Sequence, residues 1–515
     1  MTIGAPEPAS MRLSAARLLP REELRRRAGS VPMEGRNLIG GSFRDAEEGR
    51  TFDSIDPATG RRLCAVARSG EADVALAVEV ARRQFKGGAW SRLAPRDRMD
   101  VLFRLADLIE ENALAFALLD VLDVGKPIAD MFETDIPQAI LAFRFFAEAI
   151  DKTSGLATNT ALTDLNIILR EPLGVIGAIT PWNYPLLNAA WKVAPALACG
   201  NSVVLKPSEY SPLSAGLLAA LFLRAGGPEG VLNVVHGFGG EAGRALALSM
   251  GVEKIAFTGS VETGKQILIS AGQSNMKQVS TECGGKTPQI IMADCADLDR
   301  AVRACVGGLY ANQGEVCSAG SRILVARGLH DDFVDRFVRI ARDAYVPGDP
   351  LDPATRMGPL VSRAQKQRVL GYINSGLRDG ARPVLGGPAD PSDPDSCYVA
   401  PTLFTDVTPS MRIAQEEIFG PVGVVIPFDG YDEAIAIANG TIFGLAASIW
   451  TRDLNTALRA ARDIEAGVVW VNCFDRGDMT QTWGGCKQSG NGREKCMETL
   501  EQYSQTKSVW FQIGT

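Results

Sequence analysis

GVIGAITPWNYP, residues 174–185, is the stretch of sequence that decides the fold. Its first seven residues are mostly apolar and rich in β-branched side chains, which is typical of a buried strand. Two prolines and an asparagine follow, so the strand must end in a loop. This combination predicts a buried strand that opens into a loop, as at the start of a βαβ unit.

Runs of the same kind recur along the chain after about residue 35, separated by segments with helical periodicity. The β-prone runs are SVVLK (202–206), VLNVV (231–235), KIAFTG (254–259), PQIIMAD (288–294), SRILVA (321–326), PVGVVIPF (421–428) and AASIWT (446–451). The clearest helical segments are residues 73–85, 96–112 and 212–225. This alternation predicts an α/β protein with mostly parallel sheets in two α/β domains.

The composition is that of an ordinary globular enzyme. The chain has 515 residues, of which 46% are hydrophobic and 22% charged, and 53 Lys and Arg against 60 Asp and Glu give a net charge of −7. An acidic balance does not recruit nucleic acid or an anionic membrane. Ten Cys without a CxxC pair and only two His predict that the protein has no metal site and keeps reduced thiols in the cytoplasm.

Four other segments need an interpretation of their own. Residues 172–191 carry no charge, but their prolines and asparagines favour a buried strand and loop over a membrane span. Residues 1–34 are rich in Arg and lack a secretory signal, so they are either an organelle address or a flexible or docked extension. TKSVWFQI (506–513) should pair with a sheet edge of its own subunit or of a neighbour. Residues 386–396 predict an exposed loop.

A candidate nucleophile follows a helical pattern in the second half of the chain. YANQGEVCSAGSR (310–322) comes after apolar residues at helical spacing that begin at Leu298. The helix should end near Gly314, which leaves Cys317 on a loop where its thiol can face a cleft. A single cysteine taken alone is more often a small buried hydrophobic residue.

Two further segments carry groups that would support a reactive thiol. In QVSTECGGK (278–286), Glu282 lies at the end of a short strand, and it is either a surface charge or a general base. Asn183 lies between two prolines and is either a turn residue or a hydrogen-bond donor to an oxyanion.

Together these segments resemble the aldehyde dehydrogenase superfamily over nearly the whole chain from about residue 35. The stretches KPSEYSPLSA, FTGSVETGK, EEIFGPV, NGTIFGLAASIW and GGCKQSGNGRE support the resemblance, in family order. It implies NAD-dependent oxidation of an aldehyde to a carboxylic acid through a thiohemiacetal and a thioester on Cys317. In that scheme Asn183 holds the oxyanion, Glu282 activates the hydrolytic water, and Lys192 relays protons or orients the site.

The resemblance also implies where the cofactor binds. Lys206 and Glu209 would hold the adenosine ribose, and the Glu209 carboxylate favours NAD over NADP. Glu417 and Phe419 would position the nicotinamide ribose and ring. The other implied cofactor residues are Thr180, Trp182, Gly239, Gly243, Gly259, Ser260 and Gly264. The last three open a helix that would face the diphosphate.

The substrate would enter past the segment that begins at Asn472, which is similar to aldehyde dehydrogenases of putrescine utilisation that act on γ-glutamyl-γ-aminobutyraldehyde. Asp475 and Asp478 would then face an amino or guanidino group of the substrate, although they are equally interpreted as solvated loop residues. Other short aliphatic or aromatic aldehydes are the alternative substrates. Two distant alternatives are a non-catalytic paralogue and a P-loop NTPase, for which Gln266 stands where a Ser or Thr is required.

The fold implied by the resemblance has a Rossmann-like NAD-binding domain, an α/β catalytic domain and a small β projection that builds a homodimer or tetramer. The expected divisions are an N-terminal extension (1–34), the NAD-binding domain (35–153 and 173–284), the catalytic domain (285–485) and the oligomerisation elements (154–172 and 486–515).

Overall fold

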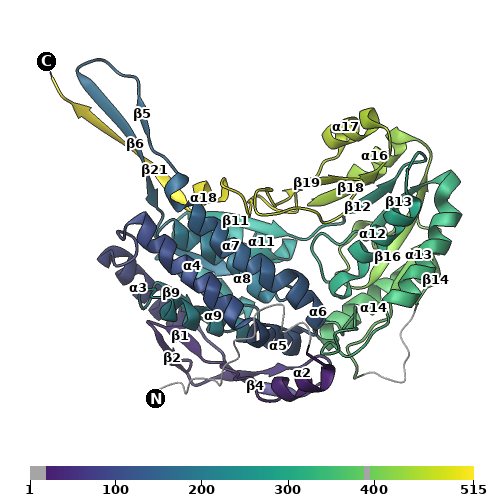
Figure 1. The fold of residues 1–515 in the computed structure, drawn as a ribbon, viewed down its shortest axis with the longest axis horizontal. Coiled ribbons are helices and arrows are strands. Elements are labelled where there is room, and N and C mark those ends of the chain that lie inside the picture. Colours follow the sequence, from purple (N-terminus) through teal and green to yellow (C-terminus); the bar gives the residue numbers. More distant parts are fainter. Residues whose placement is uncertain (1–18, 388–394, 515) are drawn as a thin grey trace.

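The computed structural model describes residues 19–387 and 395–514. It contains two seven-stranded sheets, each covered by helices, and a long three-stranded arm that projects from the body (Figure 1). The expected fold class, a Rossmann-like domain beside a second α/β domain with a β projection, is confirmed.

The first sheet contains all four of the β-prone runs that the sequence places before residue 260. Its order is β11 (Gln278–Cys283), β10 (Lys254–Gly259), β7 (Val175–Ile179), β8 (Ser202–Lys206), β9 (Leu232–Val234), β1 (Asn37–Ile39) and β2 (Ser42–Arg44). The first five strands are parallel, and β1 is antiparallel to β9. From β7 the chain first adds β8 and β9 on one side and then β10 and β11 on the other.

Both faces of the first sheet are buried, which explains why its strands read as continuous apolar runs. In β7, Ile176 and Ala178 pack into one core and Val175 and Ile179 into the other. The first core lies under α4 (Pro95–Glu111), α5 (Ala113–Val124), α7 (Ile136–Ala149), α8 (Pro185–Ala198) and α9 (Leu213–Arg224). The second lies under α3 (Glu71–Gly87), α10 (Arg244–Leu248) and α11 (Val261–Gln273).

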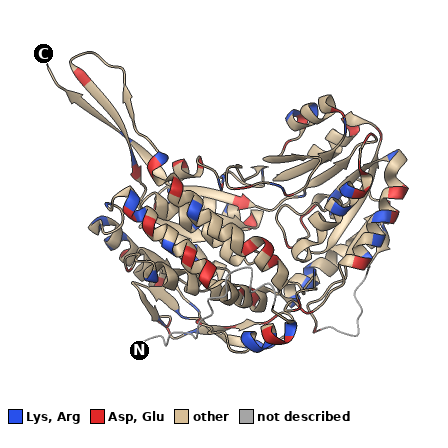
Figure 2. Ribbon diagram, in the orientation of Figure 1, with Lys and Arg blue, Asp and Glu red and all other residues tan. Residues whose placement is uncertain are grey.

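The second sheet follows the same plan. Its order is β14 (Arg382–Leu385), β15 (Thr402–Thr405), β16 (Val422–Phe428), β13 (Arg322–Ala326), β12 (Pro288–Ile291), β18 (Ala446–Trp450) and β19 (Val468–Val471). The helices that cover it are α12 (Leu298–Tyr310), α13 (His330–Ala344), α14 (Arg363–Arg378), α16 (Tyr431–Asn439) and α17 (Leu454–Asp463). Figure 2 shows that these outer helices carry mixed charges, whereas the sheet strands carry few.

The arm consists of β5 (Leu156–Thr158), β6 (Asp164–Pro172) and β21 (Ser504–Gln512). β21 pairs antiparallel with β6 along its whole length, so the predicted C-terminal strand finds its sheet edge in its own subunit. Of the segment 486–515, only β21 belongs to the arm, because β20 (Cys486–Lys487) pairs with β17 (Phe443–Gly444). Several large apolar side chains of the arm are exposed: Leu156, Leu162, Leu165, Leu169, Trp510, Phe511 and Ile513.

The described part of the Arg-rich N-terminal segment, from residue 19 on, packs against the body of the protein. Residues 1–18 lie outside the described residues, and α2 (Arg21–Ala28) follows them. Arg21 and Arg25 both pair with Asp349, at 3.1 and 2.7 Å, and Leu24 is buried in the first core. These contacts attach α2 to a loop more than 300 residues away.

Two smaller predictions concern segments away from the sheets. Most of the loop expected at residues 386–396 falls on residues 388–394, which lie outside the described residues. Residues 172–191 form the end of β6, all of β7 and the first turns of α8, as expected for a buried strand and loop. Among the described helices, none combines the length and apolar character that crossing a membrane requires.

Candidate active site

A cavity of about 600 Å³ lies between the two sheets. In the first sheet the strand order reverses between β7 and β10, and ligands of open α/β sheets bind outside the carboxyl ends of the strands at such a switch point. The loops that follow β7 and β10 both line the cavity, with Pro181 to Tyr184 and with Gly259 and Ser260. The second sheet contributes the loop after α12. The topology therefore brings a cofactor cleft and the candidate nucleophile to one cavity.

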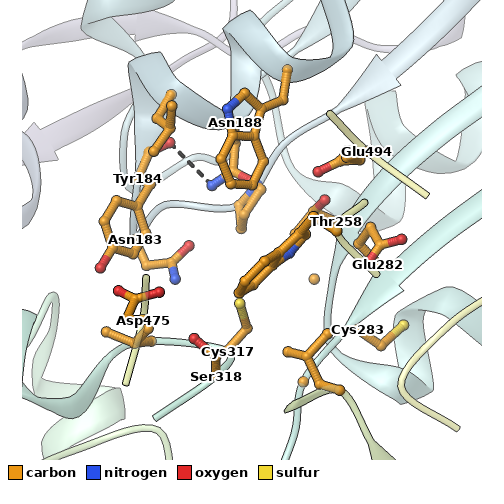
Figure 3. A pocket seen from close by; sticks show the side chains of 18 of the residues that line it. Asn183, Tyr184, Asn188, Thr258, Glu282, Cys283, Cys317, Ser318, Asp475 and Glu494 are labelled. Atoms are coloured by element: carbon orange, nitrogen blue, oxygen red, sulfur yellow. Dashed lines mark hydrogen bonds between the residues drawn. The ribbon is translucent and has the colours of Figure 1, made fainter. Parts of the chain in front are cut away.

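Three of the four candidate catalytic residues, Asn183, Glu282 and Cys317, line this cavity. Figure 3 shows Cys317 with Asn183 and Asp475 on one side and with Thr258, Glu282 and Glu494 on the other. Asn183, Glu282 and Cys317 come from three different segments of the chain. A reacting carbonyl group could therefore meet all three side chains within one cavity.

Cys317 lies on a loop, as predicted, but the preceding helix ends earlier than expected. α12 ends at Tyr310 instead of near Gly314. Asn312 and Gln313 have φ of 46° and 56°, a left-handed conformation that cannot continue the helix. Burial raises the pKa of the half-buried Cys317 thiol, and Glu417, Glu282 and Asp475 raise it further. The resting form is therefore a thiol, and the nucleophile forms only when a base takes its proton.

Asn183 is fastened to the loop that carries Cys317. Its side-chain Nδ2 donates to the backbone carbonyl of Glu315 at 2.9 Å, and the side chain of Asn312 donates to the backbone carbonyl of Asn183 at 3.1 Å. A primary amide has two N–H donors, so one remains for a ligand. This pair of hydrogen bonds links the loop after β7 to the nucleophile loop, which fits an oxyanion donor held in advance of the reaction.

Glu282 is a buried carboxyl group that lines the cavity. It lies near the end of β11, is 4% exposed, and neither of its oxygens has a hydrogen-bond partner of good geometry among the described residues. Burial raises its pKa well above the ordinary value and Glu494 adds to this, while Lys192 and Arg493 lower it. A carboxylate with a raised pKa is a stronger base, and its free oxygens can accept a proton from water or a thiol.

Lys192 lies behind this site and has a partner that sequence reasoning missed. Its ammonium donates to Thr258 Oγ1 at 2.6 Å and forms a close ion pair with Glu494, and both side chains are buried. Glu494 lines the cavity, whereas Lys192 is not one of the lining residues. One sequence signal could have indicated Glu494. It lies in the charged triplet 493–495, which directly follows a Gly-rich segment in one of the stretches that carry the family resemblance.

The residues expected to bind the adenosine end lie at the carboxyl end of β8. The Lys206 ammonium is buried and lies 3.5 Å from Glu209 Oε2. Burial lowers the pKa of Lys206, while Glu209 opposes this effect. Thr180, which follows β7, donates its backbone N–H to the Lys206 carbonyl at 3.1 Å. Gly239 and Gly243 bound a short turn after β9, outside the residues that line the cavity.

The residues expected at the diphosphate and nicotinamide meet at the cavity. Ser260 caps α11, accepting from the Thr263 N–H at 3.2 Å, so the positive end of a 13-residue helix faces this region. The ring of Phe419, a residue with φ of 60°, lies edge-on to Trp182, with centroids 5.1 Å apart. Gly264 allows α11 to approach β11, since a Cβ there would lie 3.0 Å from Cys283 Sγ.

Glu417 also lines the cavity, and its buried carboxyl group has a free hydrogen-bond acceptor among the described residues. Its Oε1 has no hydrogen-bond partner among the described residues, and burial raises its pKa to about 7. A Cβ at Gly284 would lie only 2.0 Å from this oxygen, so the glycine keeps the carboxyl group uncovered. An unsatisfied acceptor beside a helix N-terminus and an aromatic ring fits a dinucleotide, whose ribose hydroxyls need acceptors and whose phosphates need donors.

The two aspartates expected at the substrate entrance have different environments. Asp475, with φ of 52°, lines the cavity, and desolvation by the surrounding protein raises the pKa of its carboxyl group, although the residue, like Asp478, is exposed. Asp478 is exposed and is not one of the lining residues. Its carboxylate accepts from the Thr480 N–H at 2.8 Å and from the Thr480 hydroxyl at 2.5 Å, which is the arrangement of a loop-stabilising turn.

Four cavity residues that the sequence did not indicate belong to the same entrance. Trp470 and Trp483 have ring centroids 6.4 Å apart, and Trp191 lies 6.1 Å from Trp483. The ammonium of Lys495 lies over the rings of Trp191 and Trp483. Tryptophans are common in buried cores, so no single-sequence pattern distinguishes those that line a cavity.

Known proteins resemble the chain over nearly all of its length. The sequence model of the aldehyde dehydrogenase family matches residues 43–509. The NADP/NAD-dependent aldehyde dehydrogenase PuuC of Escherichia coli (strain K12) is 47% identical over 487 residues, which cover 95% of this chain and 97% of that protein.

Solved structures share the fold closely. A gamma-glutamyl-gamma-aminobutyraldehyde dehydrogenase from Burkholderia cenocepacia J2315 has a TM-score of 0.94 and 50% identity, covering 96% of this chain and 100% of that chain. An indole-3-acetaldehyde dehydrogenase in complex with NAD+ has a TM-score of 0.94 and 49% identity, with the same coverage of 96% and 100%.

Proposed function

Because the chain belongs to the aldehyde dehydrogenase family and is an NAD(P)-dependent aldehyde dehydrogenase, we propose that it oxidises an ω-amino or γ-glutamylamino aldehyde derived from polyamines. The observation that carries the proposed reaction is the single cavity lined by Cys317, Asn183 and Glu282. The γ-glutamyl-γ-aminobutyraldehyde dehydrogenase structure at 50% identity and the carboxylate of Asp475 at the entrance support the substrate class.

In the proposed first step, the Cys317 sulfur forms a bond to the aldehyde carbon. Glu282 is the base that takes the thiol proton, because its free carboxylate lies in the same cavity and its raised pKa favours proton uptake. The carbonyl π electrons move to oxygen, and the free N–H of the Asn183 amide stabilises the resulting oxyanion. The product of this step is a thiohemiacetal anion on Cys317.

In the second step, the carbon loses its hydrogen with both bonding electrons and becomes a thioester. Bound NAD(P) supplies the acceptor for that hydride. The residues of this chain that would hold it are Lys206 and Glu209 at the ribose, Ser260 at the diphosphate, and Glu417 and Phe419 at the nicotinamide end. Their part is to bind and orient, because the reacting carbon must meet the acceptor in one geometry.

In the last step, Glu282 takes a proton from water, and the hydroxide attacks the thioester carbon. The C–S bond then breaks, which releases the carboxylic acid and the Cys317 thiolate, and the proton on Glu282 returns to this thiolate to restore the resting thiol. Glu282 must first lose the proton it took in the first step. Glu494 and Lys192 form an ion pair with each other, and the charges of both act on the pKa of Glu282. We infer that this pair carries the proton away from Glu282.

The function is tested by following NADH formation with a panel of aldehydes. The panel contains γ-glutamyl-γ-aminobutyraldehyde, γ-aminobutyraldehyde, butanal and indole-3-acetaldehyde, each at several concentrations with NAD. We expect the highest kcat/KM for one of the two nitrogen-containing aliphatic aldehydes. The tryptophans at the entrance favour an aromatic aldehyde as the second candidate, and a higher kcat/KM for indole-3-acetaldehyde would select it.

Replacement of the oxyanion donor has a predicted effect of its own. Asn183→Ala should lower kcat/KM by about 10²- to 10³-fold, because the developing charge loses a hydrogen bond in a site with little water. Asn275→Ala is the matched control, since its amide donates to the Val252 carbonyl at 2.9 Å and the residue lies outside the cavity. Equal losses in the two variants would contradict the role of Asn183.

We also propose that NAD is preferred over NADP, because Glu209 would repel a 2′-phosphate. Glu209→Gln keeps the size of the side chain and removes its charge. The ratio of kcat/KM with NADP to that with NAD should therefore rise about 10-fold, a change typical of one removed charge repulsion near a protein surface. Glu229→Gln, an exposed change outside the cavity, serves as the control. An unchanged ratio in Glu209→Gln would contradict this assignment.

We infer that the arm mediates a homodimer or tetramer, because its strands and the residues next to them expose seven large apolar side chains that a second subunit could cover. In the proposed division, residues 35–153 and 173–284 bind the cofactor, and residues 285–485 carry the nucleophile.

A further inference from the structure

Lys495 is a cation that the catalytic scheme does not use. Only 7% of its surface is exposed, and it is one of the residues that line the cavity. Its Nζ lies 4.9 Å from the ring centroid of Trp191 and 5.3 Å from that of Trp483. Among the described residues, none forms a hydrogen bond or an ion pair with this ammonium. Two indole faces are therefore its only close favourable partners in the described chain.

A carboxylate of the opposite charge faces the same cavity. Asp475 also forms no hydrogen bond or ion pair with a described residue, so its oxygens lie more than 4.0 Å from the Lys495 ammonium. The two charges nevertheless interact electrostatically. Burial lowers the pKa of Lys495, and among the charges that raise this pKa, Asp475 has the largest effect. An unpaired cation and an unpaired anion thus line one cavity with a gap between them.

The other charged groups near Lys495 do not neutralise it directly. Glu494 forms an ion pair with Lys192, and the Asp478 carboxylate accepts a hydrogen bond from the Thr480 N–H. A buried ammonium without a paired anion is costly, and cation–π contacts offset only part of that cost. A ligand with an anionic group would complete the site.

The same cation disfavours the simplest substrate of the proposed class. The ammonium of a plain ω-amino aldehyde would gain from Asp475, but it would also meet the like charge of Lys495 between the tryptophans. A terminus with both charges, as in an α-amino acid, has a partner for each side chain. The γ-glutamyl group has such a terminus, because its α-ammonium and α-carboxylate remain free when it is attached through its side-chain carboxyl.

We propose that Lys495, held between Trp191 and Trp483, binds the carboxylate of a zwitterionic substrate terminus whose ammonium is bound by Asp475. This inference rests on the proposed function and narrows its substrate class to aldehydes that end in an α-amino acid. Lys495 is then a specificity-determining residue, which contacts the far end of the substrate and takes no part in the chemistry at Cys317.

The test compares two aldehydes that differ in one charge. They are γ-glutamyl-γ-aminobutyraldehyde and its analogue with an α-carboxamide in place of the α-carboxylate, both assayed through NADH formation. Wild-type protein should prefer the acid over the amide by about 10- to 100-fold in kcat/KM, the range of a charge-assisted hydrogen bond in a site of low water content. The ratio of the two rates cancels any loss of active protein.

Variants assign this preference to Lys495. Lys495→Met keeps an unbranched side chain without the charge and should reduce the ratio to about one, whereas Lys495→Arg should retain most of it. Lys495→Gln provides a second neutral variant if Lys495→Met does not fold. The matched control Lys86→Met removes an exposed Lys outside the cavity and should leave the ratio as in the wild type.

The proposed contact between Asp475 and the substrate ammonium is tested with a second pair of substrates. The N-acetyl derivative of the substrate removes the positive charge, and Asp475→Asn should abolish the wild-type preference for the free ammonium. A wild-type acid-to-amide ratio near one, or an unchanged ratio in the neutral Lys495 variants, overturns the inference while leaving the aldehyde dehydrogenase function intact. Failure of every aldehyde of the panel to yield NADH or NADPH would instead overturn the proposed function itself.

Discussion

Cys317→Ala should abolish aldehyde-dependent NADH formation, with a loss of at least about 10⁴-fold in kcat, the scale on which removal of a nucleophile acts. No other group in the proposed scheme can form the covalent bond that turns the aldehyde into a hydride donor. Cys283 also lines the cavity, but its sulfur lies 3.9 Å from the Ser260 carbonyl, at the cofactor side. It is therefore not positioned to substitute for Cys317.

Two measurements make this result specific. The Cys317→Ala protein should still bind NAD, which can be followed by quenching of tryptophan fluorescence, so the loss is one of chemistry and not of folding. Cys295→Ala is the matched control, because that thiol is half-buried against the core of the second sheet and lies outside the cavity. If Cys317→Ala retained turnover near the wild-type rate, the thioester mechanism would be wrong.

Glu282→Gln is expected to separate the two halves of the reaction. The amide keeps the shape of the side chain but cannot take a proton, so water is no longer activated and the thioester accumulates. After rapid mixing, we expect a single burst of NADH followed by steady-state turnover reduced by about 10²- to 10⁴-fold. The burst should also be slower than in the wild type, because Glu282 accepts the thiol proton in the proposed first step.

The accumulated intermediate can be identified directly. Mass spectrometry of the stalled protein should show an acyl group on the peptide that contains Cys317, and hydroxylamine should remove it. The double variant with Cys317→Ala should show neither the burst nor the adduct. Steady turnover without a burst, at a rate near that of the wild type, is the result that would exclude Glu282 as the hydrolytic base.

The sequence was sufficient for the features that depend on local pattern. β7, β8 and β10 lie within a residue or so of the runs that predicted them, because a strand buried on both faces requires continuous apolar residues. Cys317 was expected on a loop for a similar reason, since the apolar periodicity stops before it. The helix end was placed too late, because nothing in the sequence signals the left-handed conformation of Asn312 and Gln313.

Local sequence patterns could not predict which residues the side chains of the site contact. Lys192 pairs with Glu494 across 302 residues, and Asn183 donates to the carbonyl of Glu315 across 132. The same limit applies to Asp475 and Asp478, which look alike in the sequence although only Asp475 lines the cavity. Long-range contacts of this kind depend on how two sheets meet, and local propensity does not encode that arrangement.

By itself, then, the sequence determined the α/β class, the order of the strands along the chain and the residues capable of thiol chemistry, because each follows from short-range periodicity or from a family pattern. Only the tertiary structure decided which charges are paired and which remain free. Among the described residues, the ammonium of Lys495 forms no ion pair, and the fold places it over two tryptophan rings, from α8 and from the C-terminal segment. A side chain's partners are set by three-dimensional packing, and the chemistry of the cavity follows from those partners.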